Sequence, residues 1–237
     1  MYRQHADESG AVREQLVRYS VRLLSDGLAI GRAGNLSVRT TDGVLITPSG
    51  VSYHELTAAD ICQIRLDGGQ PEIPAAASSE SPMHLAVYGS ARAGAVVHTH
   101  SPEVVALSAV HDELPAIHYA ITDLGGPVRV TRYQRFGSDD LARAVVGALA
   151  DRRAAILANH GAVTYGATLG EAYDRALLLE WLARVYRLAL TAGTPRILST
   201  TELDEVTEHA RRIRYGKAQD DQRPNDQDGV TVSEGDP

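Results

Sequence analysis

The chain has 237 residues and a formal net charge of −7 at pH 7. Its length suits one globular domain that can bury a core without disulfides, and its single cysteine, Cys62, excludes both an intrachain disulfide and a cysteine-based zinc finger. The acidic balance excludes a basic surface for nucleic acid. The sequence has neither a long apolar run nor a secretion-like start, so we expect a cytoplasmic protein without membrane or nucleic-acid partners.

The first half of the chain predicts two helices and four strands. They follow one another as helix, strand, strand, strand, helix and strand, over 8–27, 36–39, 44–47, 61–66, 80–91 and 94–99. The Asp42-Gly43 pair between the first two strands is typical of a hairpin turn. Ser79 is the expected N-cap of the second helix, whose first turn tolerates Pro82.

The second half of the chain predicts three strands and three helices. Their order is strand, helix, strand, strand, helix and helix, over 127–131, 138–150, 154–158, 161–166, 169–191 and 201–214. Strands and helices therefore interleave on one apolar scaffold, without an internal repeat. We predict a single α/β domain over residues 8–216, with a flexible segment over 1–7 before it and a disordered polar tail over 217–237 after it.

Two histidines separated by one residue end the apolar run over 94–99. Side chains i and i+2 leave a strand on the same face, so His98 and His100 point into one space. His160 follows another apolar run, and Glu80 lies upstream of both histidine segments. Imidazole nitrogens are ligands that zinc prefers, and three histidines with one exchangeable acid fit a catalytic metal site. The alternative is that they bind nothing, since histidine is common in this chain and recurs at 5, 54, 84, 111, 118 and 209.

The positive charge of the chain is carried almost wholly by arginine. Its only lysine, Lys217, lies at the start of the polar tail. An enzyme that forms a Schiff base needs a buried lysine with a lowered pKa. If this chain handles carbanions, a metal must therefore stabilise the negative charge.

Three polar loops precede the His98 segment, and each suits an anion. They are Gly34–Ser37, Thr47–Gly50 and Ser78–Glu80, the last of which starts a predicted helix. Backbone N–H groups in such turns, small hydroxyls and a helix N-terminus together can bind a phosphate. Any one of them alone is more often an ordinary turn or cap, but three ahead of a histidine cluster favour a phosphate site.

These motifs together resemble the class II aldolase/adducin family over residues 8–216. Six segments come in family order and at family-like intervals: Gly34–Arg39, Ile46–Gly50, Ser78–Glu80, Val96–His100, Pro115–Tyr119 and Asn159–Gly161. The resemblance implies a three-layer α/β/α domain around a central, mostly antiparallel sheet. It also implies a homotetramer with fourfold symmetry and active sites at the subunit interfaces.

The resemblance further implies the residues that carry the chemistry. By this match His98, His100 and His160 bind one zinc ion per subunit, or another divalent ion in its place. Glu80 is then both a metal ligand and the catalytic acid/base. Tyr119 matches a tyrosine that a neighbouring subunit lends to the active site as a proton donor.

The substrate-binding positions also follow from the resemblance. Five residues match phosphate-binding positions, namely Asn35, Ser49, Gly50, Ser78 and Ser79. Phe136 and Tyr215 match positions that shape a pocket for the aldehyde. The chain departs from the family at Arg32, which stands in a glycine-rich loop where a small residue is more usual. This departure leaves the identity of the aldehyde open.

The activity that the resemblance implies is that of a zinc-dependent aldolase. Such an enzyme reversibly cleaves a ketose 1-phosphate, such as L-fuculose 1-phosphate or a 5-deoxypentulose 1-phosphate, into dihydroxyacetone phosphate and an aldehyde. Two other enzymes use the same scaffold, a pentulose-phosphate 4-epimerase and a methylthioribulose-1-phosphate dehydratase. The third alternative is an adducin-like binding module without metal, against which the intact set of four metal ligands counts.

Overall fold

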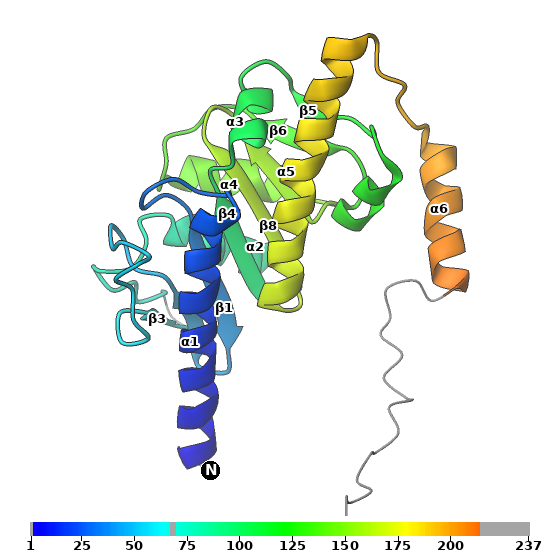
Figure 1. Cartoon of the computed structure of the whole chain (residues 1–237). Helices are drawn as coiled ribbons and strands as arrows, with labels where there is room; N and C mark the ends of the chain where they lie inside the picture. The colour runs from blue at the N-terminus through cyan, green and yellow to red at the C-terminus, as the bar shows by residue number, and fades with distance from the viewer. Residues whose placement is uncertain (1, 67–69, 214–237) are drawn as a thin grey trace, which may run out of the picture.

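The computed structural model describes residues 2–66 and 70–213, and these residues form one mixed sheet with helices on both faces (Figure 1). Tyr215 and the predicted tail over 217–237 lie outside the described residues. The strand order is β3-β2-β1-β4-β8-β7-β6-β5. The strands are β1 (Asn35–Thr40), β2 (Gly43–Ile46), β3 (Cys62–Arg65), β4 (Ala95–Thr99), β5 (Glu113–Leu114), β6 (Val128–Thr131), β7 (Ala154–Leu157) and β8 (Gly161–Gly166).

Neighbouring strands are antiparallel except for β6 and β7, which are parallel. The prediction of a mostly antiparallel sheet is therefore confirmed. The hairpin between β1 and β2 is also confirmed, because Thr40 pairs with Gly43 and leaves Thr41 and Asp42 as its two-residue turn. Such short connections are possible only between antiparallel neighbours.

Two helices cover one face of the sheet, and three cover the other. The first face carries α2 (Ser81–Ser90) and α4 (Asp139–Leu149), whose apolar residues form one core cluster with β-strand residues such as Val96. The second face carries α1 (Tyr2–Ser25), α3 (Pro102–Ser108) and α5 (Leu169–Ala192). The single α/β domain in three layers is confirmed.

Two further helices extend the second face. A 3₁₀ helix, η1 (Tyr119–Leu124), packs against α5 and against α6 (Thr200–Arg212), which stands apart from the sheet in Figure 1. The α6 helix begins at a capping box, in which the Ser199 side chain and the Glu202 side chain each bond the other's backbone N–H. This cap stabilises a helix that has little contact with the core.

Alternation along β4 decides which face carries the candidate metal ligands. Val96 belongs to the core cluster beneath α2, whereas Ala95 and Val97 belong to the cluster beneath α1 and α5. His98 and His100 follow Val96 at intervals of two, so they lie on the α2 side of the sheet. The sheet therefore directs both histidines toward the N-terminus of α2.

Most of the predicted elements match the structure within one or two residues, but some do not. Helix α1 begins at Tyr2, before the predicted boundary at residue 8. The prediction missed α3, β5 and η1. A two-residue strand and helices of at most two turns are too short to show a periodic pattern. Ser79 as the N-cap of α2 is wrong: Glu80 holds that position, with φ −96° and without a side-chain cap hydrogen bond.

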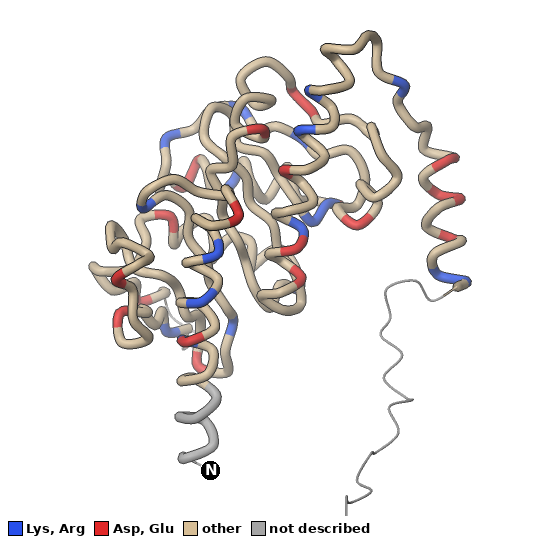
Figure 2. The backbone as a smooth tube through the Cα atoms, viewed as in Figure 1, with Lys and Arg blue, Asp and Glu red and all other residues tan. Residues whose placement is uncertain are grey.

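Figure 2 shows acidic and basic residues interspersed along the described chain. Both signs of charge therefore occur along the whole described chain. Within residues 2–66 and 70–213, no helix combines the length and the apolar character that crossing a membrane requires.

Candidate metal centre

His98 is held at the end of β4 by the strands on either side of it. It is fully buried, and its Cα pairs with Asn35 on β1 and with Val163 on β8. The Nδ1 atom of His98 lies 2.9 Å from the carbonyl oxygen of Ala162, which can only accept, so Nδ1 donates. This bond fixes the ring and leaves Nε2 free to act as a ligand, the arrangement usual for a metal-binding histidine.

His160 reaches the same place from the turn between β7 and β8. Asn159 adopts a left-handed φ of 54°, the only positive φ outside glycine among the described residues, and its N–H donates to Ser108 Oγ. At Gly161 a Cβ atom would lie 2.0 Å from the carbonyl oxygen of Thr99, so only glycine lets this turn pass so close to β4. The strained turn brings His160 against the end of β4.

Glu80 completes the group from the first position before α2. Its Oε2 atom lies 2.9 Å from His98 Nε2 and accepts a hydrogen bond of 2.9 Å from Asn35 Nδ2. Its Oε1 atom lies 3.3 Å from His160 Nε2. The carboxylate therefore turns toward the histidines, which explains why Glu80 leaves the N-terminus of α2 without a side-chain cap.

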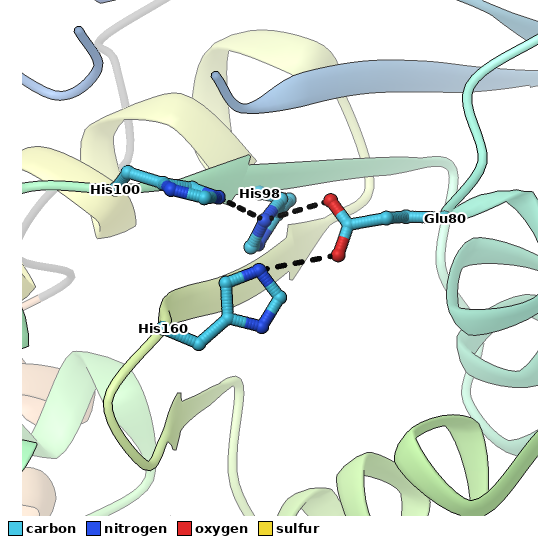
Figure 3. A group of neighbouring side chains, drawn as sticks. All are labelled: Glu80, His98, His100 and His160. Carbon is cyan, nitrogen blue, oxygen red and sulfur yellow. Dashed lines mark hydrogen bonds and ion pairs between the residues drawn. The ribbon is translucent and has the colours of Figure 1, made fainter. Parts of the chain in front are cut away.

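The three imidazoles and the carboxylate converge on one point (Figure 3). The ring centroids of the three histidines are 4.8–4.9 Å apart, and their planes cross at 73–83°. One potential ligand atom from each of the four residues lies within 4.8 Å of all the others. The predicted convergence of His98, His100, His160 and Glu80 thus exists in the structure.

The electrostatics of this group fit a divalent cation. Burial alone would raise the pKa of Glu80, but the charge of a protonated His98 and the surrounding hydrogen bonds hold it below its ordinary value. Burial opposes the charge on His98, yet the adjacent Glu80 raises the pKa of His98. Burial and the two other imidazoles lower the pKa of His100 to about 3, so that ring is neutral. A divalent cation can replace the proton that His98 and Glu80 share.

Two further contacts support a cation here. The Nε2 atoms of His98 and His100 lie 2.9 Å apart, so at most one of them carries a proton. Apart from its ion-pair contact with His160, the buried Oε1 atom of Glu80 has no hydrogen-bond partner among the described residues, a state that normally costs stability. A metal ion would be coordinated by the lone pairs of these two Nε2 atoms and by the Oε1 atom of Glu80. The donor set of three nitrogens and one oxygen suits zinc.

A cavity of about 280 Å³ opens above the cluster. All five residues predicted to bind phosphate line it, namely Asn35, Ser49, Gly50, Ser78 and Ser79. Phe136, predicted for the aldehyde pocket, also lines it and is 64% exposed. Arg32 lies in the same wall. The loops expected to bind an anion and the ligands Glu80, His100 and His160 therefore face one space.

Sequence reasoning missed some residues of the cavity wall. Tyr133 and Gln134 line it beside Phe136, and Asn159 lines it beside His160. Each of them is a sequence neighbour of a predicted residue. Including the nearby residues of the same loop in each predicted site would therefore have found them.

Tyr119 does not lie in this cavity within its own chain. It begins η1, is 51% exposed and packs its ring on that of His118, with centroids 4.4 Å apart. Its exposed position agrees with the prediction that it acts in a neighbouring subunit, and that role stays a prediction.

The sequence analysis assigned no role to His84, but this residue is fully buried one helical turn after Glu80. Its Nε2 atom lies 2.6 Å from Asn35 Oδ1, and its Nδ1 atom lies 2.7 Å from Ser37 Oγ. Asn35 thus bonds His84 through its carbonyl and Glu80 through its amide nitrogen. Because that nitrogen carries a second proton, the same side chain still has a donor for a ligand in the cavity.

The fold and the cluster define the class of protein: an α/β/α domain with a metal site at the floor of a small polar cavity. A family model described as "Class II Aldolase and Adducin N-terminal domain" matches residues 14–187. The chain therefore belongs to the class II aldolase and adducin family.

Similar proteins within this family are known. The chain is 36% identical over 197 residues to the 5-deoxy-D-ribulose 1-phosphate aldolase of Bacillus thuringiensis serovar kurstaki, covering 82% of this chain and 92% of that protein. It is 37% identical over 206 residues to the L-fuculose phosphate aldolase of Escherichia coli (strain K12), covering 85% and 94%. A solved structure of L-fuculose 1-phosphate aldolase matches with a TM-score of 0.79 and 32% identity, covering 85% of this chain and 96% of that one.

Proposed function

We propose that this chain is a zinc-dependent aldolase that reversibly cleaves a ketose 1-phosphate into dihydroxyacetone phosphate and an aldehyde. The observation that carries the proposal is the Glu80, His98, His100 and His160 cluster at the floor of a cavity lined by the loops that we predicted to bind phosphate. The names of the similar aldolases support it. The epimerase and dehydratase alternatives have no better support, because the similar proteins are named aldolases. The four intact, converging ligands count against the adducin-like alternative.

The metal supplies the part of the chemistry that no side chain here can provide. Cleavage of a carbon–carbon bond next to a ketone leaves negative charge on the ketone fragment, and a bound divalent cation stabilises such charge as a Lewis acid. No lysine is present among residues 2–66 and 70–213, so a Schiff base has no candidate there. The ligands that would hold the cation are three histidines and Glu80.

We assign the proton transfer at the ketone fragment to Glu80. Its carboxylate touches His98 and His160 and borders the cavity, so it lies next to both the cation site and the substrate space. A general acid/base must lie within hydrogen-bond reach of the proton that it moves. Tyr119 from a neighbouring subunit would supply the proton on the aldehyde side.

The phosphate group of the substrate would bind between the two serine loops. The Ser49 N–H donates to Ala76 O and the Ser78 N–H donates to Thr47 O, so these two groups hold the loops together. The remaining donors, which we assign to phosphate, are the N–H groups of Gly50 and Ser79, the second amide proton of Asn35, and the hydroxyls of Ser49, Ser78 and Ser79. Arg32 adds a positive charge at the wall of the same cavity.

The aldehyde end would lie against the aromatic side of the cavity. Tyr133 and Phe136 line it and are each 64% exposed. Exposed rings at a cavity mouth favour an apolar fragment. We therefore expect aldehydes with a terminal methyl group, such as acetaldehyde and lactaldehyde, to react faster than glycolaldehyde.

One experiment tests the proposed reaction. The zinc-loaded protein is incubated with dihydroxyacetone phosphate and each of these aldehydes, and the ketose 1-phosphates formed are separated and quantified. We expect product with at least one methyl-bearing aldehyde. A zinc-loaded protein that forms no carbon–carbon bond with any aldehyde would contradict the proposal.

The homotetramer with shared active sites and the cytoplasmic location stay predictions, and the first of them can be tested by mixing variants. Tyr119→Phe and Glu80→Gln are each expected to be nearly inactive. In a cyclic assembly each site would combine Glu80 of one subunit with Tyr119 of the next. Random mixing then restores both groups in about one quarter of the sites. Recovery near this fraction after joint refolding supports shared sites, and mixtures as inactive as their parents would exclude them.

A further inference from the structure

A ladder of buried polar side chains runs from the metal cluster into the core between α2 and β1. On α2, Glu80, His84 and Tyr88 recur every four residues, so they share one face of the helix. On β1, Asn35 and Ser37 are two residues apart, so they share one face of the strand. These two faces meet, and all five side chains are buried.

Hydrogen bonds join the members of this ladder in alternation between helix and strand. Asn35 Nδ2 donates to Glu80 Oε2 at 2.9 Å. Asn35 Oδ1 lies 2.6 Å from His84 Nε2, and His84 Nδ1 lies 2.7 Å from Ser37 Oγ. Ser37 Oγ lies 2.9 Å from the Tyr88 hydroxyl. The ladder is therefore continuous from the metal ligand to Tyr88.

The chemistry of the groups fixes the direction of each bond. The Oδ1 atom of Asn35 has no proton, so His84 Nε2 donates to it. Burial lowers the pKa of His84 to about 3, so the ring is neutral and its Nδ1 accepts from the Ser37 hydroxyl. Ser37 has only one proton, so Tyr88 donates to Ser37. Every donor in the ladder meets an acceptor in a single consistent arrangement.

This arrangement decides which end of the Asn35 amide faces the metal ligand. A side-chain amide turned by a half rotation would present its carbonyl oxygen to the Glu80 carboxylate, and two acceptors repel each other. The Glu80 carboxylate can only accept, so it selects the orientation with the amide nitrogen on its side. The Nε2–H of His84 then donates to the carbonyl on the other side and holds the amide in that orientation. The amide nitrogen is then directed toward Glu80.

We propose that His84 is a positioning residue for the metal centre: through Asn35 it holds the Glu80 carboxylate in the orientation that meets the histidine ligands. Ser37 assists by donating to His84 Nδ1, which holds the ring in place on the side away from Asn35. The effect on turnover rests on the proposed function, whereas the effect on metal binding does not. Hydrogen-bond partners behind a metal ligand typically change affinity or activity by ~10–100-fold.

The first test measures the zinc affinity of the stripped protein, without substrate, by competition with a coloured chelator. His84→Leu removes both ring nitrogens, and we expect ~10–100-fold weaker binding. His84→Gln can place an amide N–H near the position of Nε2, and we expect it to restore most of the affinity. Affinity unchanged in His84→Leu, or lost equally in His84→Gln, would overturn the proposal.

A matched pair of serine variants tests the proposal even if His84→Leu does not fold. Ser37 and Ser20 are both fully buried, and each makes a hydrogen bond through its hydroxyl, but Ser20 bonds Leu16 O within α1. Ser37→Ala should weaken zinc binding, whereas Ser20→Ala should not. Equal effects of the two variants on zinc affinity would show that the ladder only supports the fold and would overturn the proposal.

Kinetics separate this inference from the proposed function. We expect zinc-saturated His84→Leu to lose kcat while its KM for the ketose 1-phosphate stays near that of the unmodified protein, because the phosphate loops are intact. A protein without aldolase activity would contradict the proposed function, while the zinc affinities would still test the inference. If the protein is an active aldolase but His84→Leu changes neither its kcat nor its zinc affinity, the inference alone is contradicted.

Discussion

Glu80→Gln is expected to reduce turnover by ~10²–10⁴-fold, the usual contribution of a proton-transfer group, while the fold is retained and the three histidines still bind metal at saturating zinc. Glutamine keeps the size of the side chain and can still receive the hydrogen bond from Asn35, but it cannot take up and release a proton. The three histidines remain as ligands. The measurement is kcat for cleavage, with metal content and the unfolding temperature determined on the same sample.

Glu171→Gln is the matched control for this variant. Glu171 also stands in the first turn of a helix, but its Oε2 accepts from the N–H of Ala167, away from the cavity. We expect it to leave turnover unchanged. Near-native turnover in Glu80→Gln would contradict the assignment of the proton transfer to Glu80.

His160→Ala is expected to lose metal and activity together. Removing one of three imidazoles leaves His98 and His100 with an incomplete set of ligands, and we expect metal affinity to fall by more than the ~100-fold upper range typical of residues behind the ligands. Turnover should fall to background at zinc concentrations that saturate the unmodified protein. Elemental analysis after gel filtration and the cleavage assay measure the two effects.

His111→Ala provides the comparison. His111 packs its ring against Tyr186, with centroids 5.3 Å apart, and does not line the cavity. It should keep both metal and turnover. A His160→Ala protein that holds its metal as firmly as His111→Ala would remove His160 from the ligand set.

The metal ligands could be predicted from the sequence because local geometry determines their direction. The interval between His98 and His100 fixes one face of a strand, and the apolar run before each histidine segment marks the strand. The sequence does not state that β7 and β8 bring His160 to β4. That neighbourhood depends on the strand order of the sheet, which the sequence analysis did not predict. The family resemblance assigned His160 to the ligands instead.

The supporting residues were harder to predict. The sequence does not show whether a single histidine in a helix is buried or exposed, so His84 was not assigned to the site. Its four-residue spacing from Glu80 and Tyr88 is nevertheless visible in the sequence. Ser79 was chosen as N-cap because serine is a preferred cap residue. The structure instead uses Glu80 at that position and turns its carboxylate toward the histidines. A functional contact there overrides the local preference.

The central claim is that one metal ion in this cluster supports the reaction. The most direct test is to strip the protein with a chelator and then add zinc in steps, measuring bound zinc and the rate of ketose 1-phosphate cleavage at each step. The account predicts that the stripped protein is inactive and that the rate rises in proportion to bound zinc until one ion is bound per chain. Full activity in the stripped protein, or a rate that does not follow bound zinc, would contradict it.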